Sequence, residues 1–300
     1  MILSLLPIED LLKLFDDKTF QPRVIGEFTR RLRTALALFV PDPEAFRDLI
    51  RHTGSLVGGS VALWFACSLP TTWRPDYLDL LIPVASTTTV KQFLLKMPGS
   101  ALVPLTGLRN DLSDEWLYRR YSFCVWTTRG IVRVIPSMHI QPLALVPYYR
   151  GTHLMHVLSA DAFVAPYMRL TMASRAIGTD AGKTMGVDET GDGPDDEPAT
   201  CDSRGFTLHE TGAEFVNLRG GCYNFVACCQ RQRWFTDNET LLVQIGRGGD
   251  KDVFGIFRKC RWGWILRVNP CGNRTCFFSR DFTVESSWLQ PLSVTPPADM

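Results

Sequence analysis

Apolar residues recur at helical spacing through the first part of the chain. Within residues 23–39, the apolar positions Val24, Phe28, Leu32, Leu36 and Phe39 fall on one stripe, and the arginines lie largely off it. This spacing is typical of an amphipathic helix that packs one face into a core. The same criterion predicts helices over Ile8–Phe15, Arg23–Phe39, Pro43–Arg51, Ser60–Cys67 and Thr87–Leu95.

Short runs of β-branched and aromatic residues predict strands between and after these helices. Two of them, Tyr121–Thr127 and Ile131–Ile135, flank the turn-forming Thr128-Arg129-Gly130 and predict a hairpin. The remaining predicted strands are Tyr77–Ile82, Thr240–Ile245, Val253–Phe257 and Trp264–Val268. Helices and strands in this order predict an α/β fold, of the α+β type with a mixed sheet.

The apolar periodicity stops at about residue 176. Residues 178–205 hold a cluster of Asp and Glu among Gly, Thr and Pro, a composition that buries too little apolar surface to offset the entropy of ordering. We therefore predict N-terminal helices (1–40), an α/β domain (41–176), a disordered acidic linker or loop (177–205), a smaller β-rich C-terminal region (206–291) and a disordered tail (292–300).

Composition narrows the environment that we expect for the chain. Hydrophobic residues make up 45% of it, enough for a substantial core, and the net charge of +1 gives no general attraction to nucleic acid or to an anionic membrane. No apolar run approaches the roughly 20 residues that span a bilayer. The apolar stretch Ile2–Leu6 is too short for a signal peptide. We expect an intracellular protein, cytoplasmic or nuclear, with no membrane or nucleic-acid partner.

The main candidate for chemistry is a glycine-rich turn followed by a strand that carries one acid. Gly58-Gly59-Ser60 opens an apolar helix, and Asp79 lies in the strand Tyr77–Ile82. Metal-dependent nucleotidyl transfer needs carboxylates to hold two metal ions, and Asp-x-Asp on a strand presents two of them on one face. A turn at a helix N-terminus offers N–H groups to phosphate.

This candidate site is short of carboxylates. Asp79 fills the second place of Asp-x-Asp, but Tyr77 stands in the first, and Asp76 faces the opposite way in a regular strand unless a bulge turns it. Arg133 stands in the middle of the strand that would supply a third acid, where it can pair with Asp79 or clamp a phosphate. The candidates are therefore Asp79 and Asp76 for catalysis, Asp79 for metal, and Gly59, Ser60 and Arg133 for nucleotide or phosphate.

Several motifs occur together in residues 41–176. They are Pro41-Asp42-Pro43 with Phe46-Arg47, the segment Thr53–Leu63, the group Trp73, Pro75, Leu78-Asp79 and Pro83, and the group Thr152, Met155, Tyr167, Leu170 and Thr171. In order and spacing they resemble a large, mostly uncharacterised family from mushroom-forming fungi that carries a nucleotidyltransferase-like domain. The resemblance implies that fold. This chain departs from the family pattern at Tyr77, His156 and Met168.

The shortage of carboxylates decides the function that we expect. We predict a degenerate, non-catalytic nucleotidyltransferase-like protein that acts as a binding module, with a nucleotide and an unidentified protein as candidate partners. No cofactor is expected, and Mg²⁺ only if the site is active. One alternative is an active metal-dependent nucleotidyltransferase. Another is an F-box-like adaptor, because Leu6-Pro7-Ile8-Glu9 resembles the opening of an F-box.

Three further patterns have ordinary structural interpretations. Gly178–Thr184 imitates a phosphate-binding loop but has one residue too few between its glycines. His153 and His156 are spaced to share a helix face, without a third ligand nearby for zinc. Six late cysteines contain no Cys-x-x-Cys pair, so we predict buried free thiols.

Overall fold

A computed structural model gives the fold. It describes residues 2–6, 8–67, 73–104, 122–137, 141–178, 204–209, 233–235, 240–245, 257 and 261–262. The predicted strands Val253–Phe257 and Trp264–Val268, the tail 292–300 and the six late cysteines lie outside these residues, except for Phe257. Nearly all of the predicted acidic linker 177–205 also lies outside the described residues.

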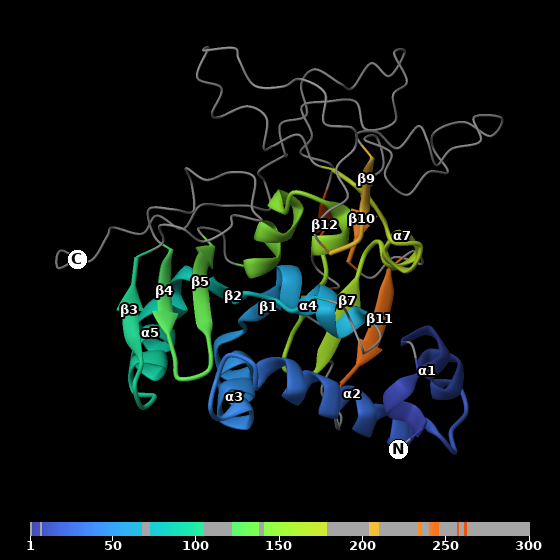
Figure 1. Ribbon diagram of the computed structural model, residues 1–300, viewed down its shortest axis with the longest axis horizontal. Coiled ribbons are helices and arrows are strands. Elements are labelled where there is room, and N and C mark those ends of the chain that lie inside the picture. The colour runs from blue at the N-terminus through green and yellow to red at the C-terminus, as the bar shows by residue number, and fades with distance from the viewer. Residues whose placement is uncertain are drawn as a thin grey trace, which may run out of the picture.

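The centre of the fold is an eight-stranded mixed sheet (Figure 1). Its strand order is β11-β7-β6-β1-β2-β5-β4-β3, in which β2 and β5 run parallel and the other neighbouring pairs are antiparallel. The strands are β1 (Leu56–Gly58), β2 (Tyr77–Pro83), β3 (Ala101–Val103), β4 (Phe123–Trp126), β5 (Ile131–Ser137), β6 (Val157–Leu158), β7 (Ala162–Ala165) and β11 (Leu241–Gln244). The predicted α/β class with a mixed sheet is therefore confirmed.

Two small strand pairs lie outside the main sheet. Strands β8 (Arg175–Ile177) and β9 (Thr207–His209) pair in parallel, and β10 (Arg233–Trp234) and β12 (Arg261–Trp262) pair antiparallel. The late strand β11 joins the main sheet through β7. The segment after residue 206 thus contributes an edge strand to the same sheet as residues 56–165.

Helices pack against the sheet, and α3 is bounded by residues typical of helix ends. In α3, Pro43 occupies the first turn, the Asp42 side chain accepts from the Ala45 N–H at 3.0 Å, and Gly54 ends the helix at φ +65°. The α-helices are α1 (Ile8–Phe15), α2 (Gln21–Leu36), α3 (Pro43–Thr53), α4 (Gly59–Ala66), α5 (Thr87–Leu95) and α7 (Met168–Met172). The 3₁₀ segments are η1 (Ile2–Leu5), η2 (Val84–Ser86), η3 (Pro142–Tyr148) and η4 (Thr152–Leu154).

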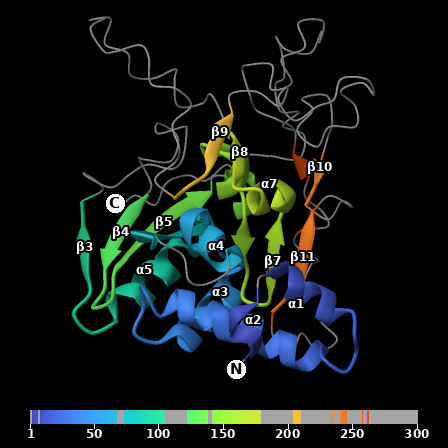
Figure 2. The same cartoon turned by 45° about the vertical axis from the view of Figure 1, so that its right-hand side comes forward.

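The two faces of the sheet bury separate apolar clusters. Along β2, Leu78, Leu80 and Ile82 pack with residues of α1 to α5, whereas Leu81 packs on the opposite side with residues of η3 and η4. Helix α2 lies across one end of the strands in both views (Figures 1 and 2). Along the described part of the chain, no helix is long and apolar enough to cross a bilayer.

Candidate functional site

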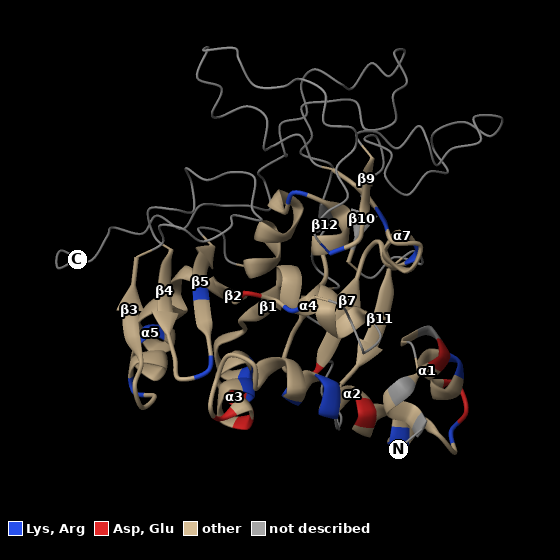
Figure 3. Cartoon of the chain, viewed as in Figure 1, with Lys and Arg blue, Asp and Glu red and all other residues tan. Residues whose placement is uncertain are grey.

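The candidate site is a row of residues that crosses the middle of the sheet. The strand register places Gly58 opposite Asp79, Asp79 opposite Arg133, and Arg133 opposite Cys124. Because residues in register on neighbouring strands share a face, Asp79 and Arg133 both lie on the side covered by η3. Charged residues are dense on α1 to α3 (Figure 3), whereas β2 and β5 each carry a single one, Asp79 and Arg133.

Asp79 and Arg133 form a bidentate ion pair inside the protein. The Arg133 Nε donates to Asp79 Oδ1 at 2.6 Å, and Nη2 donates to Oδ2 at 2.9 Å. The side chains are only 1% and 6% exposed. Burial opposes the charge of Arg133, but the attraction of the Asp79 carboxylate outweighs it and raises the pKa of the guanidinium. Both groups are therefore held charged, with each charge neutralised by the other.

Two tyrosines enclose this pair. The Arg133 guanidinium carbon lies 4.4 Å from the ring centroid of Tyr77, a stacking distance for a cation over an aromatic face. The Tyr149 hydroxyl, just after η3, donates to Asp79 Oδ2 at 3.4 Å and is buried. Tyr77, which stands in the first place of the Asp-x-Asp pattern, thus contributes an aromatic contact to the arginine.

The glycine-rich turn packs directly on the carboxylate. Gly59 has φ +61°, a conformation that favours glycine, and a Cβ added there would lie 2.8 Å from Asp79 Oδ2 and 3.1 Å from a ring carbon of Tyr149. Gly59 is also the first residue of α4, so the carboxylate lies at the positive end of the helix dipole. Ser60, in the same turn, is 4% exposed.

Asp76 is not brought into this cluster. It lies in the bend just before β2 and is exposed, whereas Asp79 is buried. Of the five residues predicted for the site, Asp79, Arg133 and Gly59 lie together, Ser60 follows Gly59 in α4, and Asp76 is outside.

The residues present do not fit a divalent metal ion. Magnesium needs several oxygen ligands, mainly carboxylates, but both oxygens of Asp79 already accept hydrogen bonds from Arg133. In the described ranges, no group of three His, Cys, Asp or Glu side chains is placed to hold a metal.

The neighbouring thiol and the two histidines are buried without a catalytic arrangement. Burial raises the pKa of Cys124 to about 11, so its thiolate is scarce at neutral pH. His153 stacks on Phe206 at 4.8 Å between ring centroids. The Nε2 of His156 lies 2.8 Å from the Thr171 hydroxyl, and burial, with the nearby His153, lowers the pKa of His156 to about 3.

Some site residues carry no signal in the sequence. Tyr149 reaches Asp79 only because η3 folds over the sheet, and nothing in its neighbourhood along the chain marks it as a site residue. The contact of Gly59 with the carboxylate depends on the antiparallel pairing of β1 with β2, and β1 is only three residues long.

Comparisons with known proteins add no relative to this picture. No family model matches the sequence, and neither the curated proteins nor the solved structures include a match to the chain.

Proposed function

We propose that the protein is a non-catalytic, nucleotidyltransferase-like binding module in which an internal ion pair replaces the metal site. The observation that supports this is the buried bidentate contact between Asp79 and Arg133. The guanidinium is a permanent cation and lies against the carboxylate that would otherwise hold a metal ion.

The energetics of the pair favour this proposal over an active enzyme. A metal ion entering the site would have to displace Arg133, which is 5% exposed, and leave its charge buried without a partner. Breaking a buried ion pair in this way costs about 3–5 kcal/mol. Asp76, the second acid of the active alternative, is exposed and in the bend before β2. Two-metal catalysis needs its carboxylate ligands on one face, and Asp76 does not lie beside the buried Asp79.

Phosphate binding at the glycine-rich turn has weaker support than the absence of catalysis. Gly59 and Ser60 begin α4, where the backbone N–H groups could donate hydrogen bonds to a phosphate. The Asp79 carboxylate approaches the same turn, however, and would repel a phosphate. Nucleotide binding at Gly59, Ser60 and Arg133 stays a prediction.

The adaptor alternative depends on the sequence resemblance at Leu6-Pro7-Ile8-Glu9, and the described residues of α1 add no support to it. Ile8 and Leu11 of α1 are fully buried in the apolar cluster shared with α2 to α5. A helix that recruits a ligase component needs an accessible apolar face, and these residues of α1 are used inside the protein.

Calorimetry and a transfer assay test the proposal together. The protein is titrated with Mg²⁺ and Mn²⁺, alone and with each nucleoside triphosphate, and is then incubated with labelled nucleotide and cell extract. We expect no metal-dependent heat beyond that of the same titration without protein, and no transfer. Transfer that depends on the metal and disappears in an Asp79→Asn variant shown to be folded would overturn the proposal in favour of the active enzyme.

A further inference from the structure

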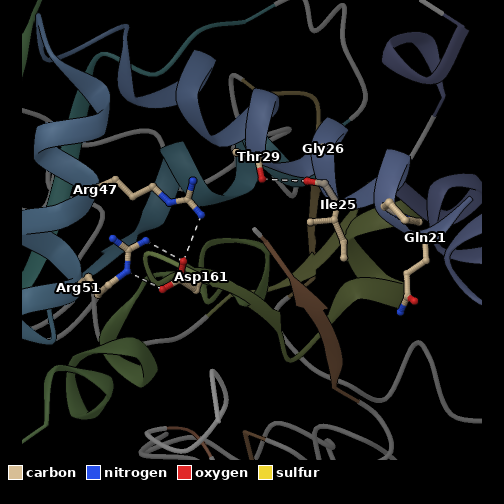
Figure 4. A pocket seen from close by; sticks show the side chains of 8 residues that line it. Gln21, Ile25, Gly26, Thr29, Arg47, Arg51 and Asp161 are labelled. Carbon is tan, nitrogen blue, oxygen red and sulfur yellow. Dashed lines mark hydrogen bonds and ion pairs between the residues drawn. The ribbon is translucent and has the colours of Figure 1, made fainter. Parts of the chain in front are cut away.

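A second feature of the molecule is a pocket of about 620 Å³ beside α2 and α3. None of its lining residues belongs to the Asp79–Arg133 site. Figure 4 shows the arginines of α3 projecting toward Asp161, which lies in the turn between β6 and β7, while residues of α2 line the other side. A pocket of this size is within the range that holds small ligands.

One end of the pocket carries two arginines on a single aspartate. Arg51 donates to Asp161 from Nε and Nη2, both at 2.8 Å, and Arg47 Nη2 donates to the same carboxylate at 3.2 Å. Arg51 also pairs with Asp48, whose side chain is 74% exposed and so screened by water. With Asp48 counted, these four side chains carry two positive and two negative charges, and the Asp48 carboxylate is the most exposed of the four.

Arg47 has hydrogen-bonding capacity left at this end. Its Nε donates to the Ala160 carbonyl at 2.7 Å, and Nη2 also donates to the Ile245 carbonyl at 3.1 Å. No group in the described ranges accepts from Nη1, which carries two further N–H donors. This end of the pocket therefore suits one additional anionic acceptor.

The other end of the pocket is of mixed character, with Gln21 and Thr29 beside Pro22 and Ile25, and it is open over Gly26. Gly26 lies in the interior of the 16-residue helix α2 and is exposed, and a Cβ added to it would meet nothing within 4 Å. Packing therefore does not require a glycine there, although glycine is a poor helix former. Pro22 and Ile25 flank this opening, and Thr29, whose hydroxyl donates to the Ile25 carbonyl, lies one turn further along.

We propose that this pocket binds a small monocarboxylic acid with a compact apolar body. The carboxylate would accept from Arg47 and Arg51, and the body would lie over Gly26 against Pro22 and Ile25. A monoanion suits this end better than a phosphate dianion, because the Asp161 carboxylate repels a dianion more strongly and Arg47 Nη1 offers only two further N–H donors. A neutral ligand would leave the guanidinium donors to water.

Binding to the full chain is measured by calorimetry with benzoate, hexanoate, benzamide and inorganic phosphate. We expect benzoate or hexanoate to bind at least tenfold more tightly than benzamide, and phosphate to bind weakly. The Ile25 methyl NMR signal of the unmodified protein should shift on addition of the bound acid. No binding at millimolar acid, equal binding of benzamide, or an unmoved Ile25 signal would overturn the proposal.

Variants locate the ligand. Gly26→Leu fills the opening and should abolish binding, and thermal unfolding checks that this variant is folded. Arg51→Gln should weaken binding at least fivefold. The matched control is Arg33→Gln, which removes an exposed charge from α2 outside the pocket. This variant should bind as the unmodified protein does. Unchanged affinity in a folded Gly26→Leu would contradict the proposed position. If that variant does not fold, the Ile25 signal alone decides.

Discussion

Arg133 reaches Asp79 across two neighbouring parallel strands, and the two residues are in register. The contact is bidentate and almost fully shielded from water, with side-chain exposures of 6% and 1%. Since a charge left alone in such a place is costly, each residue is stabilising only while the other is present.

The first prediction is a strong coupling between these two residues. Asp79→Asn and Arg133→Gln should each lower the free energy of unfolding by about 3–5 kcal/mol, because each leaves a buried charge without its partner. The double variant should lose much less than the sum of the single losses. Urea unfolding of all four proteins measures the coupling, and additive losses would show that the pair does not act as a unit.

The second prediction concerns two glycines that differ in surroundings. Gly59→Ala should destabilise the protein by about 1–3 kcal/mol, because alanine is strained at positive φ and its Cβ would meet Asp79. Gly26→Ala, in open space on α2, should stabilise it by about 0.5–1 kcal/mol through helix propensity. Thermal and urea unfolding compare them. Equal effects of both substitutions would contradict the close approach at Gly59.

The third prediction is that Arg47 holds β11 against the sheet. Its side chain donates to the Ala160 and Ile245 carbonyls, so Arg47→Ala leaves both acceptors unpaired and should cost about 1–3 kcal/mol. Hydrogen exchange at the β11 amides, read by mass spectrometry, should accelerate more than exchange in β2. Arg33→Ala is the exposed control, and uniform acceleration throughout the sheet would argue against a local role.

The fourth prediction is a loss of stability on acidification that is due to His156. Burial, with the nearby His153, lowers its pKa from 6.5 to about 3, so between these values the unfolded chain binds a proton that the folded chain excludes. The free energy of unfolding should therefore fall as pH drops from 6.5 toward 3, by about 1.4 kcal/mol per pH unit from this group.

The His156 contribution is separated from other groups by substitution. His156→Gln should flatten the pH profile of stability between pH 6 and 4. Asp161 acts over a more acidic range: its hydrogen bond with Arg51 lowers its pKa, so its stabilising effect is present above its ordinary value of 3.8 and is lost below it. A profile unchanged by His156→Gln would refute the fourth prediction.

Much of the helical part of the fold could be predicted from the sequence. The predicted helices Ile8–Phe15 and Thr87–Leu95 match α1 and α5, and the hairpin at Thr128-Arg129-Gly130 joins β4 to β5. These elements depend on periodicity and turn residues that lie close together in the chain. Prediction was weaker at helix ends: α2 begins at Gln21 and ends at Leu36, where Arg23–Phe39 was predicted.

What could not be predicted depends on contacts between distant segments. Strands β1, β6 and β7 are only two to four residues long, too short for a period-two pattern to stand out. The sequence predicts pairing with Asp79 as one of two roles for Arg133, because a cation stands where a third acid would be needed, and the structure shows that pair. The enclosure of the pair by Tyr149 was not, because it requires η3 to fold back over the sheet.

Strand β11 has a consequence for how the protein is made. It pairs with β7 but is translated long after it, because the chain must first reach Leu241. At ribosomal rates of about 5–20 residues per second, β7 waits on the order of several seconds with its backbone edge uncovered. During synthesis that edge is open to a chaperone or to a neighbouring nascent chain, so the yield of folded protein should depend on how quickly the late segment follows.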